Sequence, residues 1–346
     1  MHIGCFKIGV DCDPFIIAEL SGNHDQSLDK ALSMVDAAAA TGIHAIKLQT
    51  YTADTITLDL HEGDFYIDNP DSIWHGHSLY QLYQKAMTPW EWHQPIFERA
   101  QQQGLIAFSS PFDLTAVDYL ESLNVPCYKI ASFENTDHGL IAAVARTGKP
   151  VILSTGMASQ SELAESVEVL RNNGCENFVL LKCTSHYPAC PKDANLLTIP
   201  HLRKLFDCEV GLSDHTAGIG VSVAAVALGA SVIEKHFVLD RAEGGVDAEF
   251  SMEPNEFRML VKECQRAHDA IGNVHYGCTV KEIESRKHRR SLFIAEDMQA
   301  GEIFTKHNLR SVRPGTGLPA KYLSVFLGRI IKQDAKKGTP LSWDLL

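Results

Sequence analysis

Two histidines that follow apolar, strand-like runs are the residues of this chain best suited to hold a metal ion. His215 follows CEVGLSD (208–214), and His236 lies in SVIEKHF (231–237). The carboxyl ends of neighbouring parallel strands meet at one edge, so both imidazoles should lie at the same level. Imidazole binds Zn, Mn, Fe or Ni, and two protein ligands leave positions open for water and substrate. A lone histidine at a strand end is more often a structural residue, but the pair predicts a metal site. Glu19 or Glu234 could complete it as ligand, base or supporting hydrogen-bond partner.

Two lysines lie inside otherwise apolar runs, Lys47 in AIKLQT and Lys129 in CYKIAS. An unpaired ammonium is costly to bury, so each lysine needs an anionic partner. Gln49 faces the same side as Lys47 because strand side chains alternate, and neighbouring runs end in Ser110, Ser132, Ser154 and Ser213. Together they predict a pocket for a phosphate and a carboxylate. Two alternatives stay open: each lysine could pair with a barrel glutamate, or one could form a Schiff base with a carbonyl substrate.

Eight short runs supply the strands that position these side chains. Most are continuously apolar, as expected for parallel strands covered on their outer face, and they span 15–20, 45–50, 106–110, 127–132, 150–155, 177–183, 208–214 and 231–237. Amphipathic segments such as 28–42, 115–124 and 161–174 lie between them. This α/β alternation predicts a (β/α)8 TIM barrel. A doubly wound open sheet is less favoured, because neither GxGxxG nor the P-loop pattern occurs where that fold needs it.

The pattern changes along the chain, which predicts a catalytic barrel at 1–272, a linker at 273–286 and a small domain at 287–346. The linker is polar and basic near its end, and the last segment combines short strands with glycine turns. A domain this small is marginal alone and should be stabilised by docking. Within the barrel, the connection 51–88 is long and aromatic, as functional lids and interface segments often are.

The charge balance excludes some partners. With 31 basic and 43 acidic side chains the net charge is −12, which argues against nucleic acid or an anionic membrane as partner. A small anionic substrate remains compatible with it. No run approaches the ~18 apolar residues that cross a bilayer, and the N-terminus lacks the apolar region of a signal peptide. The nine cysteines form no CxxC pair. We therefore expect a cytoplasmic protein with reduced thiols.

The motifs at these strand ends resemble those of the sialic acid synthase family, whose members join a TIM barrel to a C-terminal antifreeze-like (SAF) domain. The resemblance covers nearly the whole chain. Its segments are IIAELSGNH (16–24), IKLQTY (46–51), FSSPFD (108–113), YKIASFE (128–134), LSTGMAS (153–159), KCTSHYP (182–188), GLSDHT (211–216), ALGASVIEKHF (227–237) and RPGTG (313–317).

The resemblance implies a role for each matching residue. His215 and His236 match metal ligands for Mn or Mg, with Co and Zn also compatible. The family's phosphoenolpyruvate-binding residues match Lys47, Gln49, Ser110, Lys129, Ser132, Ser154 and Ser213. Glu19 and Glu234 match catalytic positions, and the sugar side matches Ser185, Tyr187, Asp247 and Arg313. The match at Arg313 implies a domain-swapped homodimer, in which the tail domain of one subunit reaches the barrel of the other.

Within the family the chain is most similar to the branch that makes pseudaminic acid. ELSGNH (19–24) replaces the EIGxNHxG or EAGxNHxG pattern of the N-acetylneuraminate and legionaminate enzymes, and 78–93 also resembles the pseudaminate branch. GVDAEFS (245–251) keeps Asp247 but lacks the proline and histidine of the GPDH motif. The expected reaction condenses phosphoenolpyruvate with 2,4-diacetamido-2,4,6-trideoxy-L-altrose, an N-acetylated amino sugar, and releases phosphate. The alternative is an N-acetylneuraminate or legionaminate synthase with the same chemistry.

The resemblance also implies a mechanism. The metal polarises the aldehyde of the open-chain sugar, carbon 3 of phosphoenolpyruvate attacks it, and water adds at carbon 2 with Glu19 or Glu234 as base. Two other classes fit less well. A metal-dependent aldolase or hydrolase would leave the two lysines and the serines unexplained. A carbohydrate- or ice-binding protein would need no strand-end chemistry, and flat arrays of threonine are absent from the tail.

Overall fold

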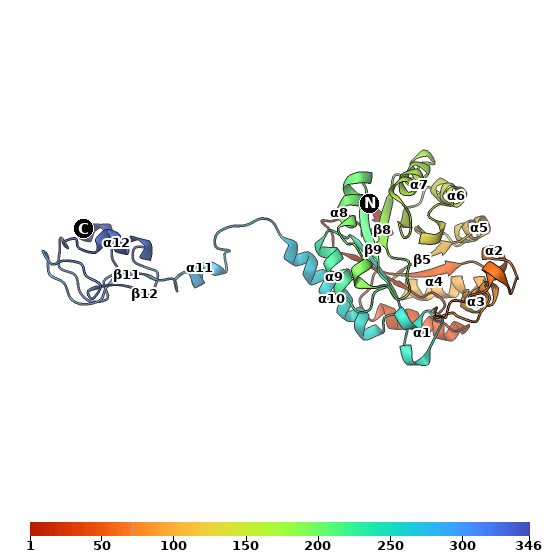
Figure 1. Ribbon diagram of the computed structural model, residues 1–346, viewed down its shortest axis with the longest axis horizontal. Helices are drawn as coiled ribbons and strands as arrows, with labels where there is room; N and C mark the ends of the chain where they lie inside the picture. Colours follow the sequence, from red (N-terminus) through yellow and green to blue (C-terminus); the bar gives the residue numbers. More distant parts are fainter. Residues whose placement is uncertain (71) are drawn as a thin grey trace. The chain divides into compact units, whose positions relative to one another are not determined.

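The computed structural model describes residues 1–70 and 72–346. The chain divides into two units, Met1–Gly272 and Asn273–Leu346 (Figure 1). Within the described ranges, no helix is both long and apolar enough to cross a membrane.

Eight parallel strands close into a barrel, which confirms the predicted TIM-barrel fold. They pair in chain order, and the last strand pairs with the first. The strands are β3 (Phe15–Glu19), β4 (Ala45–Thr50), β5 (Ile106–Pro111), β6 (Tyr128–Ile130), β7 (Val151–Ser154), β8 (Phe178–Cys183), β9 (Glu209–Ser213) and β10 (Val232–His236). In the closing pair, His236 lies opposite Glu19, and on the other side of β10, Glu234 lies opposite Ser213.

The barrel has an inner and an outer apolar layer. The inner layer contains Ile17, Phe108, Ile152 and Val232, and a short hairpin of β1 (His2–Ile3) and β2 (Phe6–Lys7) packs Ile3 against it. The outer layer lies between strands and helices. Because both faces of each strand are buried, the strand sequences are continuously apolar.

Helices follow the strands around the barrel: α1 (Leu28–Ala39), α4 (His93–Gln102), α5 (Leu114–Ser122), α6 (His138–Arg146), α7 (Gln160–Asn172), α8 (Thr198–Phe206), α9 (Gly220–Ala227) and α10 (Pro254–Ile271). Their starts follow from local sequence. The Ser27 hydroxyl accepts a hydrogen bond from the Lys30 amide, and Ser159 with Glu162 forms a capping box. Both satisfy amide groups that the first helical turn leaves unpaired.

The long connection 51–88 contains α2 (Ala53–Ile56), the 3-10 turn η1 (Gly63–Phe65) and α3 (Leu79–Ala86). Tyr66 and Ser78 form an antiparallel bridge within it. The part of this insertion at position 71 lies outside the described residues. Shorter 3-10 turns occur at η2 (Trp90–Trp92), η3 (Ser132–Glu134), η4 (Pro191–Asp193), η5 (Arg241–Glu243) and η6 (Ala248–Phe250).

The second unit has its own core, in which Leu292, Phe304, Phe326 and Leu341 pack together. Its elements are α11 (Glu282–Arg286), β11 (Ser291–Ile294), β12 (Leu309–Val312), η7 (Ala320–Tyr322), α12 (Leu323–Phe326) and η8 (Trp343–Leu345), and β11 pairs with β12 in antiparallel fashion. The linker expected at 273–286 thus ends in the short helix α11.

Candidate active site

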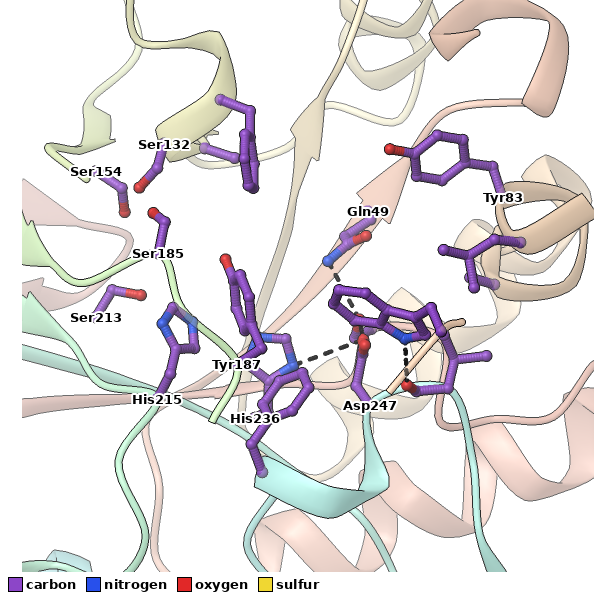
Figure 2. A pocket seen from close by; sticks show the side chains of 18 of the residues that line it. Gln49, Tyr83, Ser132, Ser154, Ser185, Tyr187, Ser213, His215, His236 and Asp247 are labelled. Atoms are coloured by element: carbon purple, nitrogen blue, oxygen red, sulfur yellow. Dashed lines mark hydrogen bonds and ion pairs between the residues drawn. The ribbon is translucent and has the colours of Figure 1, made fainter. Parts of the chain in front are cut away.

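A cavity of about 660 Å³ lies at the carboxyl ends of the barrel strands (Figure 2). This is the end at which TIM barrels place their chemistry. Most side chains singled out in the sequence line it together: Lys47, Gln49, Lys129, Ser132, Ser154, Ser185, Tyr187, Ser213, His215, Glu234, His236 and Asp247. Glu19 and Ser110 are fully buried beside Lys47. Arg313 belongs to the second unit and is exposed.

The two histidines face each other across neighbouring strands, with their ring centroids 5.3 Å apart. His215 Nδ1 lies 3.0 Å from the Thr184 carbonyl oxygen. This contact places the proton on Nδ1 and leaves Nε2 as the lone-pair nitrogen. His236 Nδ1 is buried without a hydrogen-bond partner in the described part of the chain, 3.8 Å from Asp247 Oδ2. Burial, together with the nearby positive charge of Lys47, holds the pKa of His236 well below its usual value, so its imidazole is neutral. Neutral imidazole is the form that binds metal.

The two buried lysines are paired with barrel glutamates. Lys47 forms an ion pair with Glu19, and its Nζ lies 3.7 Å from Glu234 Oε1. Lys129 Nζ lies 3.4 Å from the same Glu234 oxygen. Of the alternatives that the sequence leaves open, the structure shows the lysine–glutamate pairing. An incoming anion must share the lysines with these carboxylates.

Burial affects the two glutamates differently. It raises the pKa of Glu19, although the ammonium of Lys47 opposes the shift. It would also raise the pKa of Glu234, but the charges of Lys129 and Lys47 outweigh it and lower that pKa. The floor of the pocket thus combines two cations with two carboxyl groups of unequal acidity.

A group of serine hydroxyls lies on one side of His215 (Figure 2). The Ser154 hydroxyl is buried and lacks a partner among the described residues, whereas Ser213 Oγ donates to Glu234 Oε1 at 3.2 Å. Gly156 is part of this wall. A Cβ at that position would lie 2.1 Å from Ser185 Oγ and 2.6 Å from Ser132 Oγ. Only glycine therefore fits between these hydroxyls.

Asp247 and Gln49 lie on the other side of the histidine pair, and Tyr187 lies beside His215 (Figure 2). Asp247 accepts a hydrogen bond from Ser21, and its amide donates to Asn23 Oδ1 at 3.1 Å. Gln49 Nε2 donates to Glu19 Oε1 and to Ser21 Oγ, each at 3.2 Å. The Tyr187 ring packs 4.5 Å from the His215 ring. This side presents polar groups from β3, β4 and the loop after β10.

Several residues that line the pocket carry no clear signal in the sequence. Trp74, in the 51–88 insertion, lines the cavity and donates its indole N–H to the Val246 carbonyl at 2.9 Å. Phe250 packs against the His236 ring at 4.8 Å. Glu134 also lines the cavity. The length of the insertion indicated a functional segment but did not single out Trp74. Glu134 ends the motif YKIASFE, but the motif did not indicate a role for this side chain.

Comparisons with known proteins agree with this geometry. The NeuB family model matches residues 34–276, and the SAF domain model matches residues 289–346. The pseudaminic acid synthase of Campylobacter jejuni is 43% identical over 341 residues, covering 99% of this chain and 98% of that protein. The N,N'-diacetyllegionaminic acid synthase of the same species is 36% identical over 329 residues, covering 93% and 97%.

The fold is also shared with a solved relative. The structure of an N-acetylneuraminic acid synthetase from Leptospira borgpetersenii, in complex with citrate, matches with a TM-score of 0.74 at 34% identity. The match covers 82% of this chain and 94% of that one. The NeuB family model matches more than half of the chain, and relatives above 30% identity match it over nearly its whole length. These two findings establish the family. The chain belongs to the NeuB family and carries a C-terminal SAF domain.

Proposed function

We propose that the protein makes pseudaminic acid by condensing phosphoenolpyruvate with 2,4-diacetamido-2,4,6-trideoxy-L-altrose, with release of phosphate. It is then a transferase that forms a carbon–carbon bond. Its identity to the pseudaminic acid synthase of C. jejuni, 43%, exceeds the 36% to the legionaminic acid synthase of that species. The observation that carries the proposal is the single pocket in which two imidazoles, two buried ammonium groups and a set of serine hydroxyls meet.

The ammonium and hydroxyl groups account for the anionic reactant. Lys47, Lys129 and the serines at 132, 154 and 213 would hold the phosphate and carboxylate of phosphoenolpyruvate, with Gln49 and Ser110 supporting Lys47. Charge-assisted hydrogen bonds of this kind are roughly twice as strong as neutral ones. They position the reactant and stabilise charge while bonds change. Ser185, Tyr187 and Asp247 would contact the sugar.

The two imidazoles fit a divalent metal ion. His215 is oriented through its Nδ1 by the Thr184 carbonyl, and His236 Nδ1 has no hydrogen-bond partner among the residues that the structure describes. Two imidazole ligands would leave positions on the ion open for water and substrate. The described residues contain no cluster of three His, Cys, Asp or Glu side chains that could hold a metal. When bound, Mn or Mg, or alternatively Co or Zn, would polarise the aldehyde oxygen of the sugar.

The bond changes follow from the groups in the pocket. The double bond between carbons 2 and 3 of phosphoenolpyruvate opens as carbon 3 forms a bond to the aldehyde carbon, and the aldehyde oxygen takes up a proton and becomes a hydroxyl group. Water then adds at carbon 2. One of the buried glutamates, Glu19 or Glu234, takes the proton of that water. The resulting hemiketal phosphate loses phosphate by cleavage of the bond between carbon 2 and oxygen. Lys47 and Lys129 hold the departing phosphate.

Arg313 extends the proposal to the assembly. We infer a homodimer in which the SAF domain of one subunit brings Arg313 to the N-acyl group of the sugar in the other. The exposed guanidinium of Arg313 is compatible with such a contact. We also propose that the enzyme works in the cytoplasm, the usual compartment for nine free thiols.

Phosphate release tests the substrate directly. The metal-supplemented protein is incubated with phosphoenolpyruvate and one of three sugars: the altrose derivative, the 2,4-diacetamido sugar used for legionaminate, or N-acetylmannosamine. We expect the highest kcat/KM with the altrose derivative. A higher value with either other sugar would move the assignment to the legionaminate or neuraminate branch. No phosphate release with any of them would overturn the proposed reaction.

A further inference from the structure

The cavity has an apolar end to which the reaction above assigns no task. Six residues that line the cavity form this end, which we call the α3 wall: Ile56 on α2, Leu79, Leu82, Tyr83 and Ala86 on α3, and Phe112 after β5. The four residues on α3 are three or four positions apart, so they form one stripe along the helix. Leu82 is buried, and the other five are half-buried. The stripe therefore leaves hydrocarbon surface that an apolar part of a ligand can cover.

The α3 wall lies across the cavity from the serine hydroxyls. Figure 2 shows Ser132 and Ser154 on one side, the histidine pair and Gln49 between, and Tyr83 on the opposite side. With phosphoenolpyruvate along the serines and the aldehyde of the sugar at the histidines, the rest of the open-chain sugar extends toward the wall. The carbon farthest from the aldehyde is carbon 6, so this carbon approaches the wall.

The wall suits a methyl group at carbon 6 and not a hydroxymethyl group. A hydroxyl placed against the side chains of Leu79, Leu82 and Ala86 loses water and gains no hydrogen-bond partner from them. The Tyr83 hydroxyl points away from α3, toward the middle of the cavity (Figure 2). A methyl group at the same place buries apolar surface without leaving a polar group unpaired.

Gly22 lets α3 approach the barrel this closely. A Cβ at Gly22 would lie 3.0 Å from both the Cα and the carbonyl oxygen of Ala86, and 3.1 Å from its Cβ. The Gln26 side chain holds the same end of α3, because its Nε2 donates to the carbonyls of Lys85 and Met87 at 3.0 and 2.6 Å. Gly22 belongs to ELSGNH, at the position that the pattern EIGxNHxG leaves open to any residue. The motif that sets this chain apart from the neuraminate and legionaminate patterns thus contacts the α3 wall.

We propose that the α3 wall selects a sugar with a methyl group at carbon 6, which packs against Leu79, Leu82 and Ala86. Gly22 is a positioning residue, because it sets how closely α3 approaches the barrel. The inference deepens the proposed function and rests on it, since it names the part of the sugar that the wall recognises. A hydrophobic pocket discriminates against an added hydroxyl by up to about a hundredfold. We therefore expect the 6-deoxy sugar to be preferred by about tenfold to a hundredfold.

Two sugars that differ only at carbon 6 test this preference. The full-length protein with added Mn and phosphoenolpyruvate receives either the altrose derivative or its 6-hydroxy counterpart, and phosphate release gives kcat/KM for each. Leu79→Gln places an amide on the wall and should reduce the wild-type ratio of the two values at least about fivefold, with KM for phosphoenolpyruvate unchanged. Leu58→Gln is the matched control and should keep the wild-type ratio. Leu58 is an exposed leucine of the same insertion and is not among the described residues that line the cavity.

A second pair of variants tests the positioning residue. Gly22→Ala should also reduce the ratio, whereas Gly220→Ala, on α9, should not, because a Cβ there meets nothing within 4 Å. An unchanged ratio in Gly22→Ala would overturn the role of Gly22. If Leu79→Gln does not fold, Ala86→Ser replaces it on the same stripe and should lower the ratio.

The outcomes separate this inference from the proposed function. Equal kcat/KM values of wild type for the two sugars would overturn the role of the α3 wall, and so would an unchanged ratio in the wall variant. Either result would leave the proposed condensation standing. No phosphate release with either sugar would instead overturn the proposed function.

Discussion

At the scale of single residues, the pocket contains several buried polar atoms that have no hydrogen-bond partner among the described residues. These atoms are His236 Nδ1, Ser154 Oγ and one oxygen each of Glu134 and Glu234. Most buried polar groups in proteins are paired. A cluster of exceptions in one cavity therefore marks the place where a ligand supplies the missing partners.

The histidine pair gives the first prediction at this scale. His236→Asn should lower kcat at least about a hundredfold, because loss of a Lewis acid removes several kcal/mol of charge stabilisation. Treatment with EDTA should have a similar effect on wild type, and added Mn should restore the rate. His186→Asn is the control, since that exposed residue lies at the pocket and its Nδ1 contacts the Pro188 carbonyl. Full turnover by EDTA-treated protein would refute the metal assignment.

At the scale of elements, the 51–88 insertion forms a wall of the pocket on the side of Asp247. Trp74 connects the two, because its indole N–H binds the carbonyl of Val246, the residue before Asp247. Its ring also lies 6.0 Å from that of Tyr187. The insertion and the loop after β10 should therefore act together on the sugar and not on the anion.

Trp74→Phe should raise KM for the sugar about fivefold and leave KM for phosphoenolpyruvate unchanged, since a hydrogen bond contributes about 1 kcal/mol. Steady-state kinetics with each substrate varied separately measures this split. Trp90→Phe is a matched control, because Trp90 also donates its indole N–H to a carbonyl, that of Tyr51, at 3.2 Å. Equal effects of the two changes on both KM values would show that Trp74 has only a structural role.

Two buried histidines should make the stability of the barrel depend on pH. Burial lowers the pKa values of His24 and His93 to about 4, below the ordinary value of about 6.5. The unfolded chain therefore binds protons more readily than the folded one between these limits. The stability that the two neutral histidines contribute is complete above about pH 6.5 and is lost as the pH falls toward 4.

Each of these histidines should lower the free energy of unfolding by about 2 kcal/mol at pH 5 relative to pH 7.5. Urea unfolding at several pH values measures this. His93→Asn, which removes the titrating group beside Thr50, should lower the stability at pH 7.5 but flatten the acid-side slope. His201→Asn, at an exposed position on α8, should keep the wild-type slope. A slope unchanged by His93→Asn would contradict the assignment.

At the scale of the whole molecule, the chain consists of a catalytic barrel and a SAF domain with separate cores. The surfaces of the second unit carry Arg313, which the family resemblance connects to the sugar. A residue that acts in another subunit can be recognised by complementation, because a mixed dimer then combines one intact barrel with one intact tail.

Arg313→Ala should raise KM for the sugar about tenfold or more, as expected for loss of a charge-assisted contact. Mixing Arg313→Ala with the inactive His236→Asn protein, after subunit exchange, should give more activity than the two proteins show separately. Arg329→Ala, another exposed arginine of the same unit, should have little effect. No gain on mixing would mean that Arg313 acts within its own subunit or not at all.

The amino-acid sequence by itself determined the barrel fold and most of the residues that line the pocket. Each strand is a short apolar run that ends in polar residues, and closure of eight parallel strands brings those ends together whatever the details of packing. This is why His215, His236, Lys47 and Lys129 could be assigned to one cavity before any distance was known.

The tertiary structure alone decided how these side chains are paired. The sequence could not choose between an anion and a glutamate as the partner of Lys47, because Glu19 and Glu234 come from strands far apart in the chain. Nor could it orient Glu134 or bring Trp74 to Val246. Periodicity fixes which face of a strand a residue occupies, whereas the contacts of loop residues depend on the packing of segments that no local pattern relates.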